Sequence, residues 1–520
     1  MYYFSESRTN YLPTKQERNT KMGKPNSNNF ENVSISESID ENIENIKNIM
    51  KSCSDLLLNP FIISGVKCNL VCLEGMVSTS TITNLILNPL TEIDLPPDLN
   101  GAEVYDHIDK YMLLTIDRGI VTEYGDLIRR LMSGFAVILI DGVNKAFGLG
   151  VQGYAVRGVD EPSSEGNIFG SHEGFTETVR TNMSLVRRRI KSPLLKFELF
   201  PITKFSRVDV IVSYIDGRVP AKLVQQVKKQ LENIKLDTVL SGGYVEPFLN
   251  GTKLSLFSGV SVTERPDVFC AKILEGRIGV MIEGTPFALI LPALFIENFQ
   301  TLDDYAFRPY YATLMRWVRY IAFVVSVFLP AVYVALVTFH PELFNQTMLI
   351  ILCEAEELAP LPLAVEAIIV LVFYEMIREA GVRLPKSIGG AVSIVGGLII
   401  GDAAVSAGVI SNPLLLVCAI SVTASFVIPS LNQPVTVLRF LSVIAGGTAG
   451  LFGIALIASA MIVNICSLEN AGTPVMSPVS PFTPRAMRDV SLRIGFRKMQ
   501  EKSASIESLN GVNMRDGGIK

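Results

Sequence analysis

The chain has 520 residues, of which 49% are hydrophobic and 18% charged, and its formal net charge at pH 7 is −4. A chain of this length folds into more than one domain, and its acidic balance provides no basic surface of the kind that nucleic-acid-binding proteins need. The seven Cys are scattered and odd in number, and only three His are present. This composition argues against a disulfide framework, a zinc site and imidazole chemistry.

Residues 1–55 differ in composition from the rest of the chain. They are rich in Asn, Ser, Glu and Lys, and they contain no basic start followed by the apolar core of a signal peptide. We therefore expect a disordered or weakly helical arm in this segment. Insertion into a membrane would then be directed by later apolar segments.

Residues 56–300 mix strand and helix patterns. Three apolar runs, each closed by an acid–Gly turn pair, are predicted to be strands: Val137–Ile140, Val208–Ile215 and Ile278–Ile282. Apolar residues at three- and four-residue intervals predict helices over Phe175–Ile190 and Pro220–Ile234. Alternation of strands with helices indicates an α/β region, and the repeated turn pair suggests related α/β units.

The end of this region allows two interpretations. The apolar segment 278–297 is long enough to approach a membrane span, but it contains an acid–Gly turn, Pro286 and Pro292. Because these residues interrupt a continuous helix, we expect a terminal strand followed by an interfacial helix.

The C-terminal part is apolar. Val318–Phe339 contains 22 residues without a charge, which is about 33 Å of helix and enough to cross a bilayer. Further apolar segments cover 363–377, 388–410, 413–431 and 440–466. The sequence thus predicts an α-helical, multi-pass membrane domain of four or five helices over 301–470, followed by a basic tail over 471–520.

The positions of Lys and Arg predict the orientation of these segments. The connection 340–362 contains neither residue and is expected outside, whereas 378–387 contains three and is expected in the cytoplasm. If all five segments cross, the basic tail ends outside, which violates the rule. We favour the interpretation that 363–377 does not fully cross; the alternative is that the tail breaks the rule.

Carboxylates inside the apolar block are candidate functional groups, because charges in hydrocarbon are costly. Glu366 and Glu375 are candidate intramembrane carboxylates, and their nine-residue spacing places them on opposite sides of a helix. Asp402 lies in the Gly-rich segment. Glu354, Glu356 and Glu357 lie on the 340–362 connection, either as a solvated acidic loop or as a vestibule that collects cations.

The segment 388–410 is rich in Gly. Small residues permit close packing between helices, and they also suit the wall of a pore. Either role would use the same candidate residues, which are Val392, Ile394, Val395, Ile399 and Asp402.

Four arginines cluster near the end of the predicted helix 175–190: Arg180, Arg187, Arg188 and Arg189. They suit either a solvated helix end, where cations match the helix dipole, or a patch that binds a phosphate or a lipid headgroup. The nearby Gly148-x-Gly150-x-x-Gly153 is followed by strand and turn residues rather than by the helix that a dinucleotide site requires. With no other catalytic motif, we expect no enzyme, no cofactor and no metal site.

Several strings resemble the A subunit of the GerA family of spore germinant receptors. The strings are EGFTETVRTNMSLVRRRIKSP at 173–193, SGGYVEPFL at 241–249, TERPDVFCAKILEGRIGVMIEGTPFALILPALFIENFQTLDDYAFRP at 263–309, REAGVRLPKSIGGAVSIVGGLIIGDAAVSAG at 378–408 and ASFVIPS at 424–430. The resemblance extends from about residue 55 to residue 485. Two departures are Asp402, where relatives are expected to carry a polar amide, and the acidic run 353–366, where they tend to be more basic.

The resemblance implies a subunit of a nutrient receptor in the spore inner membrane. It implies a cytosolic N-terminal region of two α/β subdomains, split near 195–205, before the membrane domain. It further implies a transporter-like B subunit and a lipoprotein C subunit as partners, and self-association as a pentameric ring around a germinant-gated ion channel. For the string at 378–408 it favours pore lining.

Three other functions remain open at this level. The chain could be a scaffold subunit that assembles the receptor without conducting ions, or a secondary transporter, although no repeated halves with broken helices are evident. A phosphate- or nucleotide-binding regulator acting through Arg187–Arg189 is the third.

Overall fold

The structure is a computed structural model, and it describes residues 29–91, 95–96, 99–111, 117–153, 162, 165–166, 168–204, 206–250, 255–357, 359–384, 397, 403–484, 486–495, 506 and 509. The chain divides into two compact units. One comprises Met1–Gly158 with Arg180–Glu198, and the other comprises Val159–Val179 with Leu199–Lys520.

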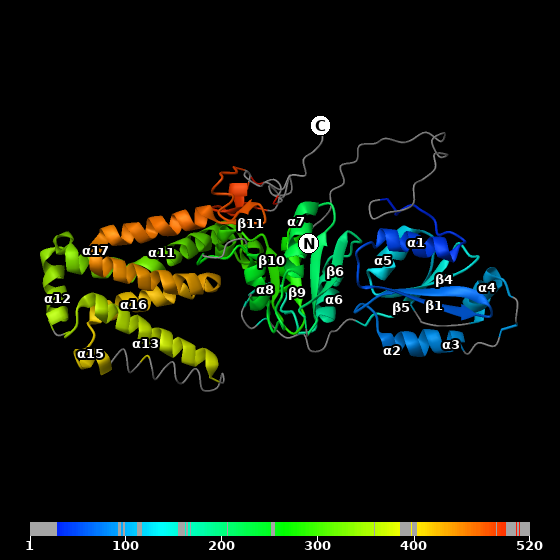
Figure 1. The fold of residues 1–520 in the computed structure, drawn as a ribbon, viewed down its shortest axis with the longest axis horizontal. Helices are drawn as coiled ribbons and strands as arrows, with labels where there is room; N and C mark the ends of the chain where they lie inside the picture. Colours follow the sequence, from blue (N-terminus) through cyan, green and yellow to red (C-terminus); the bar gives the residue numbers. More distant parts are fainter. Residues whose placement is uncertain are drawn as a thin grey trace. The chain divides into compact units, whose positions relative to one another are not determined.

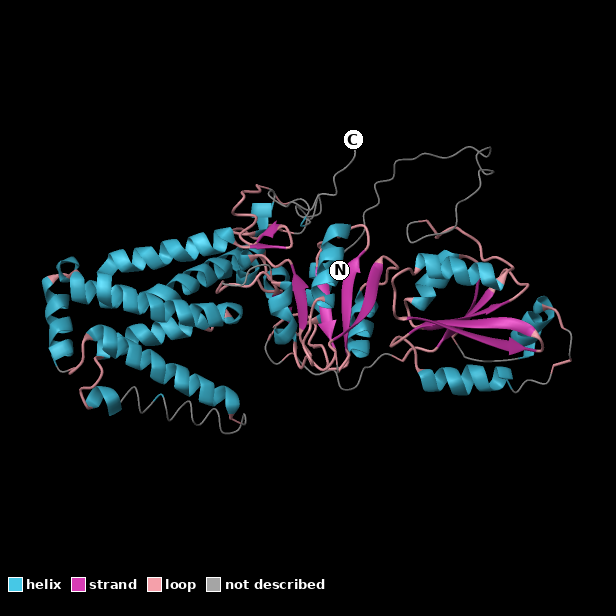
Figure 2. Cartoon of the chain, in the orientation of Figure 1, coloured by secondary structure: helices cyan, strands magenta, loops and turns pink. Residues whose placement is uncertain are grey.

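The first α/β domain is a five-stranded sheet in which all paired strands are antiparallel (Figures 1 and 2). The strand order is β1-β2-β4-β5-β3. The strands are β1 (Leu56–Ile63), β2 (Val66–Leu73), β3 (Arg118–Val121), β4 (Phe135–Ile140) and β5 (Ala146–Gly150). The helices are α1 (Ile39–Ile49), α2 (Thr79–Ile82), α3 (Asn88–Thr91), α4 (Gly101–Tyr111) and α5 (Tyr124–Leu131), with a π-helical turn over Thr83–Leu87.

Helices cover both faces of this sheet. Successive side chains of a strand point to opposite faces, and in β2 Leu70 packs into the cluster with α4, whereas Val71 packs into the cluster with α1 and α5. Both residues are fully buried. The alternation therefore builds one apolar core on each side of the sheet.

Helix α1 extends the packed domain beyond the boundary that composition predicts. Its Ile46 and Ile49 are fully buried, and Ser38 caps it by accepting the N–H of Glu41. The polar composition of residues 1–55 reflects the exposed face of an amphipathic helix in addition to any arm. Residues 1–28 lie outside the described part of the chain.

The second α/β domain contains another five-stranded antiparallel sheet, of order β6-β7-β9-β10-β8. The strands are β6 (Leu195–Ile202), β7 (Val208–Ile215), β8 (Ser261–Thr263), β9 (Ile278–Ile282) and β10 (Ala288–Leu291). The helices are α6 (Val179–Arg189), α7 (Ala221–Glu232), α8 (Gly242–Leu249) and α9 (Pro266–Leu274). When the strands of each domain are numbered from its first strand, the two orders are identical.

The acid–Gly turns occupy equivalent places in the two sheets. Gly75 and Gly217 follow β2 and β7, and Gly142 and Gly284 follow β4 and β9, all with positive φ between 75° and 86°. Glycine adopts this conformation without steric cost. The predicted strands that end at these turns are confirmed, and the pair at Glu74-Gly75 escaped the sequence analysis.

Equivalent side chains also cap equivalent helices. Asp141 after β4 accepts the N–H of Ile39, the first residue of α1, at 3.0 Å. Glu283 after β9 accepts the N–H of Val179, the first residue of α6, at 2.8 Å. The following glycine donates its N–H to the carbonyl two residues before each helix (Gly142 to Glu37 and Gly284 to Glu177, both 2.8 Å). Shared strand order and shared capping show that the two domains are two copies of one fold.

Two sequence predictions for this domain need correction. Helix α6 begins at Val179 rather than Phe175, because the Glu283 cap fixes its first residue. The segment 278–297 is not a terminal strand with an interfacial helix. It forms the β9–β10 hairpin, and only a short 3-10 helix follows, over Phe295–Phe299. By contrast, α7 begins directly after Pro220, as predicted.

A helical bundle follows a short helix, α10 (Asp303–Ala306). It consists of α11 (Pro309–Phe339), α12 (Gln346–Glu357), α13 (Leu363–Arg383), α15 (Ala404–Ser406), α16 (Asn412–Ser425) and α17 (Asn432–Ser467). Short 3-10 turns cover Pro341–Leu343 and Pro429–Leu431. Most of the predicted segment 388–410 lies outside the described residues.

Helix α17 is a hairpin of two helices rather than one rod. Gly450 has non-helical angles (φ 61°, ψ −146°) and lies against Phe339 at the end of α11. Val435 and Ile465 belong to one buried cluster, although a straight helix would separate them by about 45 Å. The predicted single segment 440–466 therefore contains the end of the first helix, the bend at Gly450 and most of the second helix, which runs back alongside the first.

After α17 the chain forms a small two-stranded sheet, β11 (Glu469–Asn470) and β12 (Thr473–Pro474), and a 3-10 turn over Ala486–Asp489. Both ends of the α17 hairpin and residue Val475 pack with Phe295 and Phe299 of the second α/β domain. The tail thus returns to the end of the bundle at which α11 begins.

Candidate functional site in the helical bundle

The candidate pore residues Val392, Ile394, Val395, Ile399 and Asp402 all lie outside the residues that the structure describes. Their role remains a prediction from the sequence. The described part of the bundle places the other predicted carboxylates and reveals one buried charge that the sequence analysis did not single out.

Glu366 lies in the first turn of α13 and is 1% exposed. Its Oε1 accepts the backbone N–H of Ser411, the residue that precedes α16. A carboxylate at this position satisfies one of the N–H groups that a helix leaves unpaired at its start, and the helix dipole favours its charge.

Glu375, two and a half turns further along α13, has different neighbours. It forms an ion pair with Arg378 of its own helix at 2.6 Å and accepts a hydrogen bond from Thr436 of α17 at 3.3 Å. The two carboxylates therefore meet different helices, as their spacing in the sequence predicts.

Arg439 is the buried charge that the sequence analysis missed. It lies in α17, is 1% exposed, and donates from Nε to the carbonyl of Ser326 in α11 at 2.8 Å. Its Nη2 lies 3.5 Å from the carbonyl of Ser421 in α16. One arginine thus joins three helices. Its position within a long apolar run was the available signal, because buried charges in such runs are functional candidates.

The predicted anion patch on α6 is not an open cluster of positive charge. Arg187 is fully buried and forms a bidentate ion pair with Asp55 at 2.9 and 3.0 Å. Its guanidinium also lies 4.7 Å from the ring centre of Phe197. Arg180 is paired with Glu74, and Arg188 and Arg189 are half-buried. Arg187 is therefore held inside the fold by Asp55. Anion binding by the other three arginines, which was one of two interpretations of the cluster, stays a prediction.

A second buried ion pair lies beside the last strand of the α/β region. Glu297 accepts from Arg277 and from Lys272, the latter at 2.7 Å. Burial alone would raise the pKa of this carboxyl, but the two cations outweigh burial and lower the pKa of Glu297 to about 2. The carboxylate also accepts the backbone N–H of Leu294 at 3.1 Å, so it fixes the turn that leads to the bundle.

Charged residues also join the tail to the start of the bundle. Asp304 accepts from Arg316 at 3.1 Å and from Arg319 at 2.8 Å. Asp489 of the tail accepts from Arg316 at 3.0 Å and from the Tyr305 hydroxyl at 2.6 Å. Burial, together with the charge of Asp489, raises the pKa of Tyr305, so the hydroxyl remains a donor. Asp304, Arg316 and Asp489 therefore hold the tail against the first turns of α11.

The glycine motif at 148–153 does not open a helix. Gly148 and Gly150 lie in strand β5, and a side chain at Gly148 would collide with Arg130. The glycines allow close packing of the strand, as the sequence interpretation against a dinucleotide site expected.

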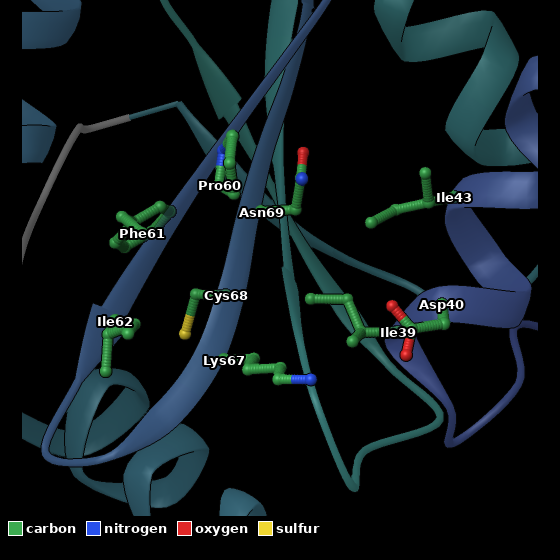
Figure 3. Close-up of a pocket in the computed structure, with 9 residues that line it drawn as sticks. All are labelled: Ile39, Asp40, Ile43, Pro60, Phe61, Ile62, Lys67, Cys68 and Asn69. Atoms are coloured by element: carbon green, nitrogen blue, oxygen red, sulfur yellow. The ribbon is translucent and has the colours of Figure 1, made fainter.

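Two cavities in the described part of the chain are candidate binding sites. One, of about 560 Å³, lies between α1 and the β1–β2 hairpin (Figure 3). Its lining is mostly apolar and contains one carboxylate, one ammonium group and one thiol: Ile39, Asp40, Ile43, Pro60, Phe61, Ile62, Lys67, Cys68 and Asn69. The other, of about 290 Å³, lies where α11 ends and α13 begins, and it contains two carboxylates, Glu356 and Glu366. The second cavity is the better candidate for binding chemistry.

Comparisons with known proteins agree with one another. Residues 44–505 match the family model described as Bacillus/Clostridium GerA spore germination protein. The chain is 35% identical over 483 residues to the uncharacterized membrane protein YfkQ of Bacillus subtilis (strain 168), which covers 92% of this chain and 93% of that protein. It is 35% identical over 487 residues to spore germination protein KA of the same strain, covering 92% and 89% of the two chains.

Further matches are of the same kind. Spore germination protein GerLA of Bacillus cereus is 30% identical over 472 residues, covering 90% of this chain and 95% of that protein. Among solved structures, the N-terminal domain of the A subunit of the Bacillus megaterium spore germinant receptor GerK3 is 31% identical. That match covers 50% of this chain and 97% of the solved one, with a TM-score of 0.39.

Proposed function

We infer the function from one premise: this chain belongs to the Bacillus/Clostridium GerA family of spore germination proteins. We therefore propose that it is the A subunit of a nutrient receptor that triggers germination. The observation that carries the proposal is the extent of the match, which runs from residue 44 to residue 505 and so includes both sheets and the helical bundle.

The proposed location is the inner membrane of the spore, with the bundle embedded in lipid. Two helical segments, Pro309–Phe339 and Pro429–Ser467, are long and apolar enough to cross a membrane, and the second is the hairpin bent at Gly450. Large apolar side chains on the bundle face outward, among them Trp317, Ile321, Leu416 and Phe452, which are 51%, 59%, 63% and 70% exposed. Contact with lipid accounts for such a surface.

The bend at Gly450 supports a topology in which the basic tail obeys the charge rule. The hairpin adds a crossing to the five expected from the sequence, so that an even number returns the tail to the side of the α/β region. Helix α13, Leu363–Arg383, is about 31 Å long and does not need to stop short of crossing. We place the α/β region and the tail in the cytosol and α12 on the outer side.

The finer mechanism follows the family resemblance. The chain would act with a transporter-like B subunit and a lipoprotein C subunit, and copies of it would assemble as a pentameric ring around a germinant-gated ion channel. If 388–410 lines that channel, Val392→Ala and Ile394→Ala alter ion leak through the assembled receptor. If these two variants change only the stability of the protein, the chain is a scaffold and conduction occurs elsewhere.

The receptor proposal is tested in spores. The chain is expressed with its B and C subunits in a strain that lacks other nutrient receptors, and release of monovalent cations and loss of refractility are followed after addition of amino acids, sugars or nucleosides. We expect a response to at least one nutrient, and none in matched spores that lack only this chain. Equal responses in both strains would overturn the proposal.

A further inference from the structure

The connection between α11 and α13, taken together with the first part of α13, has an unusual charge composition. Residues 340–377 contain six Glu and neither Lys nor Arg. Carboxylates near apolar surroundings are costly unless a positive charge or several hydrogen-bond donors compensate them. No basic side chain of this stretch can do so, apart from His340, whose ring lies 3.4 Å from Glu342.

Two of these carboxylates face the same cavity. Glu356 comes from the end of α12 and Glu366 from the start of α13, and Thr338 at the end of α11 lines the cavity with them. The cavity measures about 290 Å³, room for a cation with several waters at roughly 30 Å³ of liquid volume each.

The oxygens around this cavity are incompletely bonded within the described part of the chain. Glu366 is 1% exposed, yet only one of its two oxygens is used, by the N–H of Ser411. Oε1 of Glu356 is buried without a hydrogen bond of normal geometry, and so are the hydroxyls of Tyr333 and Ser411, which are not among the residues that line the cavity. The Tyr333 hydroxyl lies close enough to Glu356 to form a side-chain hydrogen bond of poor geometry with it.

A purely structural role explains only part of this arrangement. As a cap for α16, Glu366 needs one oxygen, and a neutral amide would serve equally well. The cap leaves the second oxygen of Glu366 unused, and the buried oxygen of Glu356 has only the poorly aligned Tyr333 hydroxyl beside it. Two carboxylates that share a cavity without a cation also repel each other.

We propose that Glu356 and Glu366 form a low-affinity site for a hard cation at the outer end of the bundle. Carboxylate and hydroxyl oxygens are the ligands that such cations prefer. Among the described residues no group of three or more His, Cys, Asp or Glu side chains could hold a metal ion, so water completes the coordination and the cation exchanges readily. Cation binding at this site goes beyond the proposed receptor function. Both carboxylates lie in the acidic run 353–366 of this chain.

The test uses the purified full-length protein in detergent. Its thermal unfolding is measured in N-methyl-D-glucamine chloride while CaCl2, MgCl2 or KCl is titrated at constant ionic strength. We expect a saturable rise in the melting temperature. A rise in melting temperature with CaCl2 or MgCl2 would indicate that one divalent cation binds both carboxylates. A rise with KCl alone would indicate that the site binds a monovalent cation. No saturable rise with any of the three salts overturns the proposal.

Three variants make the assignment specific. Glu356→Gln and Glu366→Gln keep the size of each side chain and an acceptor oxygen, and the second retains the cap on α16. Each should weaken the apparent cation affinity about tenfold or more. Glu354→Gln, at an exposed position on α12 outside the cavity, should leave it unchanged. Equal affinities in all three variants would contradict the site.

Unfolding of each variant in the absence of added cation separates loss of binding from loss of fold. The assay needs no nutrient and no partner subunit. A negative result therefore leaves the receptor proposal standing, and a failure of the receptor experiment leaves the cation site standing.

Discussion

The α/β region and the helical bundle treat buried charge differently. In the α/β region Arg187 meets Asp55, and Arg277 meets Glu297. In the described part of the bundle Arg439 bonds only to backbone carbonyls, and Glu366 only to a backbone N–H. The buried charges of the α/β region thus form ion pairs with one another and stabilise the fold. Arg439 and Glu366 lack such ion pairs, unlike Glu375, which pairs with Arg378, and Arg316 at the start of α11, which pairs with Asp304 and Asp489. Buried charges without an ion pair suit groups that act on something other than the fold.

The largest expected effect concerns Arg187. Replacing it by Met keeps much of its volume but leaves Asp55 buried without a partner, since the present pair is only 1% and 2% exposed. We expect the compact unit that contains both residues, Met1–Gly158 with Arg180–Glu198, to lose about 3–5 kcal/mol of stability. Hydrogen exchange of amides in the first sheet measures this loss in the full chain.

The control is Lys110→Ala, which removes an exposed ion pair with Asp106 of the same domain. It should change stability by less than about 1 kcal/mol. A loss of stability in Arg187→Met as small as that in Lys110→Ala would show that the buried ion pair is not what stabilises the α/β region.

The second effect concerns pH. The pKa of Glu297 is lowered from 4.5 to about 2, so its stabilisation is complete above pH 4.5 and is lost as the pH falls toward 2. Acid unfolding of the wild type and of Glu297→Gln measures this loss.

In Glu297→Gln we expect lower stability at neutral pH and a flatter acid limb. Glu232→Gln, an exposed position at the end of α7, provides the reference and should follow the wild type. Superimposable acid profiles for the wild type and Glu297→Gln would show that the ion pair does not form.

The matched replacement in the bundle is Arg439→Met. Removing a buried charge whose hydrogen bonds go to backbone carbonyls rather than to a carboxylate should change stability by no more than about 1 kcal/mol, while the nutrient response of spores is slowed. Thermal unfolding in detergent and the spore assay give the two readings. A loss of stability as large as that of Arg187→Met would mean that the bundle and the α/β region use charge in the same way.

The smallest effects test the equivalence of the two sheets. Asp141→Ala and Glu283→Ala each remove one cap from an equivalent helix and should each cost about 1 kcal/mol. Hydrogen exchange of α1 and α6 measures the two losses separately. A large effect of one and none of the other would indicate that the shared capping has no shared energetic role.

Much of the α/β region can be predicted from local signals. The strands that end at Asp141, Asp216 and Glu283 were identified because a turn with positive φ requires glycine, and an acid before it is easy to recognise. The shared strand order was not predictable in the same way, because pairing between distant strands leaves no local pattern. Burial of Arg187 was missed for a similar reason, since its partner Asp55 is 132 positions away.

The bundle was harder to predict. Hydropathy located its apolar segments, but the reversal at Gly450 stands among several other glycines, including Gly446, Gly447 and Gly453, which the helices retain. The non-helical backbone angles of Gly450, φ 61° and ψ −146°, distinguish it in the structure, and no local sequence pattern indicates them. The cavity that contains Glu356 and Glu366 likewise depends on how α12 and α13 pack, which spacing along the chain does not specify.

The most direct test of the membrane arrangement uses a maleimide that does not cross membranes. Cys353 on α12 is exposed and reports on one end of the bundle, whereas cysteines introduced at Leu492 and Lys110 report on the tail and the α/β region. Each reporter is placed singly, with Cys466 and, where needed, Cys353 replaced by Ser. Cys68 and Cys72 are buried and should stay unreactive, because burial raises their pKa values to about 12 and about 11.

In sealed vesicles of known orientation, we predict that the reagent labels positions 492 and 110 from the same side and Cys353 only from the opposite side. Labelling of all three positions from one side of intact vesicles, or of position 492 together with Cys353, would contradict the account of a bundle that crosses the membrane and returns its tail to the α/β region.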